Sequence, residues 1–174
     1  MTFKYPAWAC PSLLYPPSVA ESEQSLQERH APRSTCFGCG PANATGLRIR
    51  SFPRGDDVVM TFRARPEHEA FPGYLNGGIA GTLFDCHLNW AGVHALMQRS
   101  GATSAPTTVT SGYSVRFRRP IPTAGDITVI ARAVDVQDDR VVVEGRMIAG
   151  DRECATARGT FVSVKEGHPA FHRW

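Results

Sequence analysis

The chain has 174 residues, of which 42% are hydrophobic and 20% are charged, which suits one domain core and is too little for two ordinary domains. Its formal net charge of +3, from nineteen Lys and Arg against sixteen Asp and Glu, is too small and too evenly spread for a dedicated nucleic-acid surface. No apolar run reaches the roughly 18 residues that a membrane-spanning helix needs, so we expect a soluble protein without membrane contacts.

The N-terminal segment differs from the rest of the chain. Prolines interrupt its apolar stretches at positions 6, 11, 16 and 17, so it lacks the continuous apolar region of a signal peptide. Residues 19–30 form a polar segment with helix-forming Glu, Gln and Leu residues and predict one short helix. We therefore expect an N-terminal extension over residues 1–35 and one domain over residues 36–174. The five widely spaced cysteines, an odd number, are typical of a reducing compartment and indicate a cytoplasmic protein.

Two strands joined by a turn are predicted next. Apolar residues alternate over residues 46–52 and recur over residues 57–64, as they do in strands with one buried face. The Pro-Arg-Gly-Asp sequence at residues 53–56 is typical of a tight turn. These segments therefore indicate a β-hairpin.

A long helix and four further strands complete the prediction. Residues 77–97 carry apolar side chains around most of a helical circumference, so we expect this helix to be nearly buried. Four β-rich runs follow, separated by short turns, at residues 107–118, 126–136, 140–148 and 153–164. Because short turns favour antiparallel neighbours, the predicted fold class is α+β, with a curved antiparallel sheet of about six strands wrapped around one long central helix.

The start of this helix contains residues suited to catalysis. Gly77 and Gly78 let a ligand approach the first N–H groups of the helix, which have no intrahelical partner and can hold a developing oxyanion. Asp85 is the only carboxylate residue between Ile79 and Met97, and a buried, unpaired Asp is costly enough to need a reason. Residues 77 and 85 lie roughly 12 Å apart along the helix axis, so one helix cannot present both to one carbonyl. Two antiparallel copies across a twofold axis would bring them together, and catalysis therefore requires at least a dimer.

Three motifs carry a resemblance to a known family. They are residues 36–43 (CFGCGPAN) followed by Gly46 and Leu47, residues 76–78 (NGG) with residues 83–85 (LFD), and residues 114–120 (SVRFRRP). Over about residues 36–164 the chain resembles the hotdog-fold acyl-CoA thioesterases of the PaaI-like group. The resemblance implies that a homodimer or a dimer of dimers hydrolyses acyl-CoA to a carboxylic acid and free coenzyme A, without a cofactor.

The resemblance also implies a role for each site residue. Gly77 and Gly78 would supply the oxyanion N–H groups, and Asp85 from the other subunit would act as general base or nucleophile. Asn76 replaces the usual His of the family; it can donate a hydrogen bond to the thioester oxygen but cannot titrate near neutrality. Several relatives carry a hydroxyl residue on the strand after the helix to orient the attacking water, and Thr110 occupies that position.

The cysteines raise the question of a metal. Cys36 and Cys39 have the spacing of half a zinc site, but the sequence lacks a second pair because Cys86 and Cys154 are isolated. We therefore interpret the Cys36–Cys39 segment as a tight turn and expect no metal. Cys86 also departs from the family pattern, which often has Glu after the helix acid.

Two other sets of residues have both a functional and a structural interpretation. On the strand after the helix, an apolar side should face the helix, while Arg116, Arg118 and Arg119 form a basic side that either binds the phosphates of coenzyme A or simply faces solvent. His87 and His94 share a helical face without further ligands at metal spacing, so we expect core or interface histidines.

Two other functions remain open at this point. A hotdog hydratase or dehydratase acting on acyl thioesters would need a His paired with the helix acid; Asn76 argues against it, whereas His68 lies nearby in sequence. A non-catalytic acyl-CoA-binding protein would explain why Asn76 and Cys86 depart from the family pattern. The sequence does not reveal which acyl group is bound.

Overall fold

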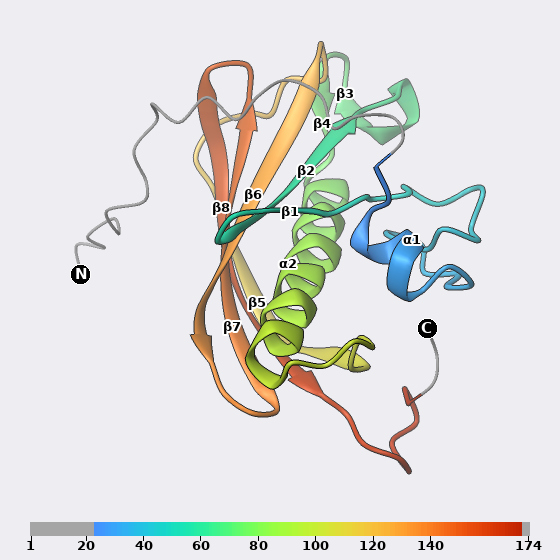
Figure 1. Cartoon of the computed structure of the whole chain (residues 1–174). Coiled ribbons are helices and arrows are strands. Elements are labelled where there is room, and N and C mark those ends of the chain that lie inside the picture. Colours follow the sequence, from blue (N-terminus) through green and yellow to red (C-terminus); the bar gives the residue numbers. More distant parts are fainter. Residues whose placement is uncertain (1–22, 172–174) are drawn as a thin grey trace.

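A long helix lies against one face of a six-stranded antiparallel sheet (Figure 1). The computed structural model describes residues 23–171. Its elements in chain order are α1 (Leu26–His30), β1 (Phe52–Arg54), β2 (Asp57–Arg63), the 3-10 helix η2 (Pro66–His68), β3 (Glu69–Phe71), β4 (Tyr74–Leu75), α2 (Gly77–Ser100), β5 (Thr108–Phe117), β6 (Asp126–Val136), β7 (Arg140–Ala149) and β8 (Arg152–Ser163). The sheet order is β1-β2-β6-β7-β8-β5. This arrangement confirms the predicted α+β class and the hotdog fold.

Close packing fixes α2 on the sheet. Gly145 of β7 approaches the helix so closely that an added Cβ would lie 2.6 Å from Leu88 Cδ1. Gly92 of α2 approaches β7 in the same way, because its Cβ would lie 2.7 Å from Val141 Cγ1. Glycines on both elements therefore allow the two backbones to pack closely, and the buried apolar side chains around them form one core.

Local periodicity predicted the second half of the chain well. The strands β5 to β8 agree with the four predicted runs to within one residue at each end. Helix α2 begins at the predicted residue and continues to Ser100, where Gly101 ends it with a φ of 69°. That left-handed conformation costs glycine little, which explains why the helix stops there.

The predicted strand over residues 46–52 is wrong, because β1 begins only at the last of these residues. Leu47 and Ile49 are buried, as the alternation predicts. Their N–H groups, however, donate to the carbonyl oxygens of Phe37 at 2.8 Å and Gly38 at 2.9 Å. Since the partner of this segment is a loop, no regular strand ladder forms.

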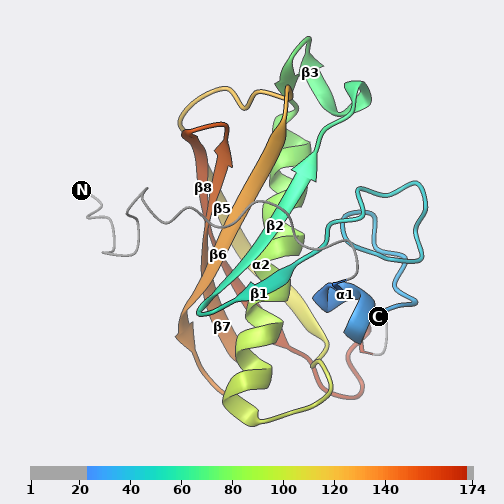
Figure 2. The ribbon, with the colours of Figure 1, turned by 45° about the horizontal axis from the view of Figure 1, so that its top comes forward.

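The helix predicted within residues 19–30 is shorter than expected. It begins at Leu26, because Ser25 caps it: the Glu28 N–H donates to the Ser25 hydroxyl at 3.3 Å, and the Ser25 N–H donates to the Glu28 carboxylate at 2.9 Å. Residues 19–22 lie outside the described residues. Leu26 joins the hydrophobic core, and α1 lies on the opposite side of α2 from the sheet (Figure 2).

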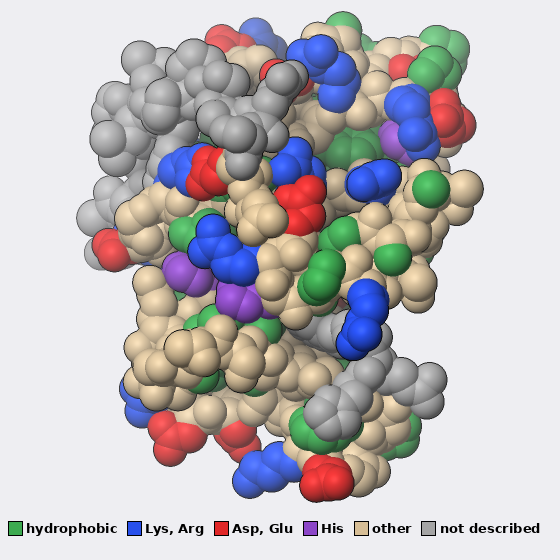
Figure 3. All heavy atoms as spheres, turned by 45° about the vertical axis from the view of Figure 1, so that its right-hand side comes forward, with side chains coloured by type: hydrophobic (Ala, Val, Ile, Leu, Met, Phe, Trp, Pro, Cys, Tyr) green, Lys and Arg blue, Asp and Glu red, His purple; other side chains and the backbone are tan. Residues whose placement is uncertain are grey.

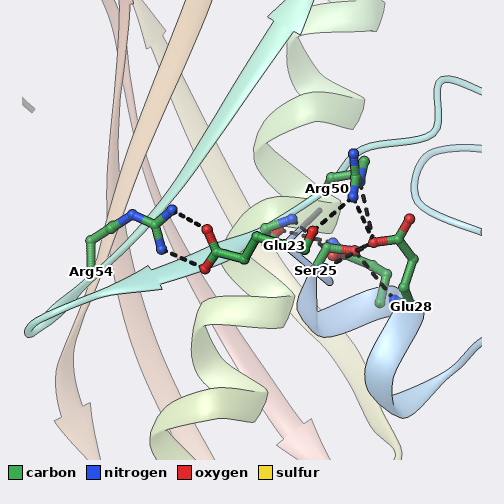
Figure 4. A network of polar contacts seen from close by, with 7 residues as sticks. Glu23, Ser25, Glu28, Arg50 and Arg54 are labelled. Atoms are coloured by element: carbon green, nitrogen blue, oxygen red, sulfur yellow. Dashed lines mark hydrogen bonds and ion pairs between the residues drawn. The ribbon is translucent and has the colours of Figure 1, made fainter. Parts of the chain in front are cut away.

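Ion pairs hold the residues around the start of α1 to β1 and to the segment before it (Figure 4). Arg54 donates to both carboxylate oxygens of Glu23, at 2.9 and 2.6 Å. Arg50 donates to the Glu28 carboxylate at 2.9 Å. The hydrogen bond from Arg54 lowers the pKa of Glu23 below its usual value. This described part of the N-terminal region is therefore fastened to the domain.

A buried polar chain connects α1 to α2. Gln27 accepts from Ser51 N and donates to Ser51 Oγ, both at 2.8 Å, and Ser51 Oγ lies 2.8 Å from His87 Nδ1. His87 Nε2 lies 3.1 Å from the carbonyl oxygen of Val58, which can only accept, so Nε2 carries the proton. Burial lowers the pKa of His87 to about 4. His87 is therefore a core residue, as predicted.

Sequence patterns did not predict the hairpin formed by β3 and β4. Its turn contains Gly73 with a φ of 85°, and the Glu69 carboxylate accepts from Gly73 N at 3.0 Å and from Thr123 Oγ1 at 2.5 Å. The hairpin leads directly into α2, where Asn76 N donates to the His68 carbonyl oxygen at 2.9 Å. These contacts position Asn76, the residue that immediately precedes the helix.

The surface agrees with the small net charge of the chain. On the face that carries α1, Lys and Arg side chains are interspersed with Asp and Glu and do not form one basic patch (Figure 3). Within the described residues, none of the helices combines the length and the apolar character that crossing a membrane would require.

Candidate functional site

The N-terminus of α2 is capped by its own preceding residue. Asn76 Oδ1 accepts from Gly78 N at 2.8 Å and from Ile79 N at 3.4 Å, as an N-cap residue typically does. The Gly78 N–H is therefore already bound in this structure. Gly77 occupies the first helical position, where the N–H has no intrahelical acceptor. The donors that remain for an incoming oxyanion are the Gly77 N–H and the Nδ2 group of the exposed Asn76 side chain.

Asp85 and Thr110 lie together. Thr110 Oγ1 donates to Asp85 Oδ1 at 2.8 Å, so the strand residue selected from the sequence contacts the helix carboxylate directly. The Asp85 side chain is half-buried. Burial raises its pKa above the usual value, and the hydrogen bond from Thr110 opposes this rise. The pair links α2 to β5, and solvent can reach it because Thr110 is exposed and Asp85 is only half-buried.

One face of α2 runs along β5. An added Cβ on Gly77 would lie 3.7 Å from Phe117, and one on Gly81 would lie 3.4 Å from the Tyr113 hydroxyl. Further along the same face, Asn89 Oδ1 accepts from Thr108 Oγ1 at 2.6 Å. Every fourth residue of the helix therefore meets β5, from the capped N-terminus past Asp85, in the order Gly77–Phe117, Gly81–Tyr113, Asp85–Thr110 and Asn89–Thr108.

A β-bulge explains how Thr110 and Tyr113 reach the same helix. Strict alternation would place residues 110 and 113 on opposite faces of the strand. In the pairing with β8, Thr110 faces Phe161 and Gly112 faces Thr160, so Ser111 is the extra residue. The alternation of the strand predicted that Tyr113 faces the helix, but it did not predict that Thr110 shares this face. The pKa of Tyr113 is raised first by burial and then by the charge of Asp85.

β5 is an edge strand with an exposed apolar surface. Within the described residues it pairs only with β8, which leaves its other edge open. Its aromatic side chains Tyr113 and Phe117 are 44% and 52% exposed although they also contact α2. A long edge strand with exposed aromatic residues is a surface that favours pairing with another strand.

The three predicted arginines differ in their surroundings. Arg118 lies 3.4 Å from the Glu153 carboxylate, and Arg119 donates to the Glu153 carbonyl oxygen at 2.9 Å. Arg146 shares the same carboxylate at 2.7 Å. Arg116 is exposed and has no ion pair in the part of the chain that the structure describes. Of the three, Arg116 is therefore the most available to a phosphate.

Three cysteines meet beside the site, and the expectation that Cys86 is isolated is wrong. The sulfur atoms of Cys36, Cys39 and Cys86 all lie within 4.8 Å of one another. The turn at residues 36–40 packs onto α2, so residues distant in sequence become neighbours. Hydrogen bonds from Cys39 and Cys86 lower the pKa of Cys36. The contact with Cys36 raises the pKa of Cys39, and the contacts with Cys36 and Cys39 raise the pKa of Cys86.

His68 is not placed for proton transfer with Asp85. Its ring is buried, tilts against Phe62 with 5.3 Å between centroids, and has both nitrogens near Arg65. Burial lowers the pKa of His68. This side chain therefore has a structural role in the segment before α2.

Comparisons with known proteins agree with the fold. A family model described as the thioesterase-like superfamily matches residues 78–170. A thioesterase superfamily protein of Shewanella loihica is 26% identical, with a TM-score of 0.57 over 72% of this chain and 98% of that chain. A thioesterase of Haemophilus influenzae is 19% identical, with a TM-score of 0.60 over 70% of this chain and 84% of that chain.

A further structural relative has lower sequence identity. The PaaI protein from the phenylacetic acid degradation operon of E. coli is 17% identical, with a TM-score of 0.59 over 71% of this chain and 85% of that chain. At this identity the likeness, like that to the Haemophilus protein, concerns the fold alone. None of the curated proteins matches the chain.

The family match includes the elements that carry the site. It spans α2 from its second residue onward and all of β5 to β8, so Asp85 and Thr110 both lie within it. The matched residues are more than half of the chain. The chain therefore belongs to the thioesterase-like superfamily.

Proposed function

We propose that the protein is an acyl-CoA thioesterase that releases a carboxylic acid and free coenzyme A. The observation that carries this proposal is the 2.8 Å hydrogen bond from Thr110 to Asp85, on the face of α2 beside the open edge of β5. It holds a carboxylate beside a hydroxyl oxygen that can also accept a hydrogen bond from water. Membership of the thioesterase-like superfamily supports thioester hydrolysis as the chemistry.

The active site is composite in this proposal. The Gly77 N–H and Asp85 lie too far apart on one helix, roughly 12 Å along its axis, to act on the same carbonyl group. A second copy, paired through the open edge of β5, would place the N-terminus of its α2 near Asp85 of the first copy. A twofold axis would create two such sites.

The chemical step follows from these groups. Asp85 takes a proton from a water held by Thr110, and the water oxygen attacks the thioester carbon; alternatively Asp85 attacks and water hydrolyses the resulting anhydride. The Gly77 N–H and Asn76 Nδ2 of the other copy stabilise the oxyanion. Collapse breaks the carbon–sulfur bond, and the proton passes to the coenzyme A thiolate. Arg116, which lacks an ion pair in the described part of the chain, is suited to a phosphate of coenzyme A.

A hydratase or dehydratase fits the geometry less well, because it needs a titrating partner for Asp85, whereas His68 is buried in contact with Phe62 and Arg65. A non-catalytic acyl-CoA-binding protein would hold its ligand with the same residues as a thioesterase. Substrate turnover distinguishes that protein from a thioesterase.

The first test is thiol release from a panel of short, long, branched and aryl acyl-CoAs, with Asp85→Asn as the variant. The substitution keeps the shape of the side chain and removes its charge, so we expect hydrolysis to fall by a factor of about 10² to 10⁴. Asp56→Asn, at an exposed turn position, is the matched control and should retain full activity. Equal activity in both variants would remove Asp85 from catalysis, and binding without any thiol release would identify a binding protein.

A further inference from the structure

The three-cysteine cluster has the dimensions of a metal site. Cys36 Sγ lies 3.8 Å from Cys86 Sγ, and Cys39 Sγ completes a group in which no two sulfur atoms are more than 4.8 Å apart. Zinc–thiolate bonds of about 2.3 Å in a tetrahedron place sulfur atoms about 3.8 Å apart. The cluster therefore needs only small side-chain movements to surround one ion.

The backbone around the cluster keeps the thiols together. Gly40 N donates to the Cys36 carbonyl oxygen at 2.9 Å, which closes the turn between the first two cysteines. Gly38 packs directly on α2, because an added Cβ would lie 2.4 Å from Cys86 Sγ. A glycine is thus required where the turn meets the third cysteine. The packing of the turn on the helix therefore holds the three thiols close together.

The surroundings of the sulfur atoms also suit thiolates. The indole N–H of Trp90 donates to Cys39 Sγ at 3.4 Å. Such an outer donor orients and stabilises a metal-bound thiolate. Cys36 is exposed, so the open side of the cluster faces solvent.

We propose that Cys36, Cys39 and Cys86 bind one zinc ion as three thiolates, with a water molecule or another small ligand in the fourth position. Binding releases the thiol protons to solvent and changes no oxidation state. Thiolates select thiophilic ions such as Zn²⁺ over Mg²⁺ or Ca²⁺. The ion would join the turn at residues 36–40 to α2 one residue after Asp85, which gives it a role in holding the site in place.

The test is Co²⁺ titration of the full reduced chain, followed by displacement with Zn²⁺. Three thiolates around tetrahedral Co²⁺ produce a sulfur-to-cobalt charge-transfer band, and we expect one ion per chain. Cys36→Ser, at an exposed position, should lose the band and weaken Zn²⁺ binding at least 100-fold. Cys154→Ser is the matched control, because this buried thiol lies on β8 and contacts the Arg152 carbonyl oxygen; it should bind as the parent does.

Two results would overturn the zinc site. One is the absence of a charge-transfer band in protein whose five thiols have been counted as free. The other is Zn²⁺ binding that is unchanged in both Cys36→Ser and Cys39→Ser. Two variants are used so that misfolding of one does not decide the result. A reversible disulfide between two of the three cysteines, with no metal binding after reduction, would indicate a redox pair instead. None of these readouts depends on thioester hydrolysis, so the two proposals fail separately.

Discussion

In the proposed mechanism, Gly77 both begins helix α2 and supplies a backbone donor to the oxyanion. Asn76 Oδ1 already accepts a hydrogen bond from the Gly78 N–H. The backbone donor that remains is therefore the N–H of Gly77, the first residue of the helix. Proline is well tolerated at this position because it already lacks an N–H and its φ suits the helix. Asn76 has a φ of −64° and a ψ of 135°, which is also the backbone conformation that a residue before proline prefers.

We therefore expect Gly77→Pro to remove one oxyanion donor without breaking α2. The kcat for thioester hydrolysis should fall by a factor of about 10² to 10³, as when other enzymes lose one such donor. Gly77→Ala keeps the N–H, and its Cβ would contact Phe117 at an ordinary 3.7 Å, so it should retain nearly all activity. Steady-state kinetics with circular dichroism provides the measurement. Comparable loss in both variants would show that the space at Gly77 matters and the N–H does not.

At the scale of elements, sequence periodicity located the strands that lie between short turns. Strands β6, β7 and β8 form a continuous meander, and the turns around them are readable as short polar segments. Strand β5 was located as well, although its partner in the sheet is the distant β8. Periodicity failed at residues 46–51, where the hydrogen-bond partner is the turn around Phe37 and Gly38. It also missed the bulge at Ser111, because Thr110, Ser111 and Gly112 show no apolar alternation in which a shift of one residue could be recognised.

A buried glutamine contributes to the attachment of α1. Gln27 is 1% exposed and satisfies both the N–H and the hydroxyl of Ser51. Gln27→Leu would leave a buried N–H without an acceptor, which we expect to lower the free energy of unfolding by about 1–3 kcal/mol. Gln24→Leu changes the same side chain at an exposed position and should have little effect. Urea unfolding at one protein concentration measures the free energy of unfolding of both variants. Equal values for Gln27→Leu and the parent would mean that water replaces the lost acceptor.

At the scale of the whole molecule, sequence reasoning located the catalytic candidates but not the cysteine cluster. Asp85 and Thr110 were found because a helix acid and a strand hydroxyl stand at family spacing, and the structure places them 2.8 Å apart. Cys86 meets Cys36 only because a turn 50 residues earlier packs on α2. No local pattern encodes such a contact, since it depends on the complete tertiary structure.

The open edge of β5 leads to the last prediction, which concerns two copies of the chain. If each site combines Gly77 of one copy with Asp85 of the other, an equal mixture of Gly77→Pro and Asp85→Asn chains should recover activity after subunit exchange. Random pairing leaves both groups intact in about one quarter of the sites, so about 25% of the parent activity is expected. Each variant alone, carried through the same exchange, is the control. If the site instead lay within one chain, every site would keep one lesion and the mixture would stay as inactive as its components.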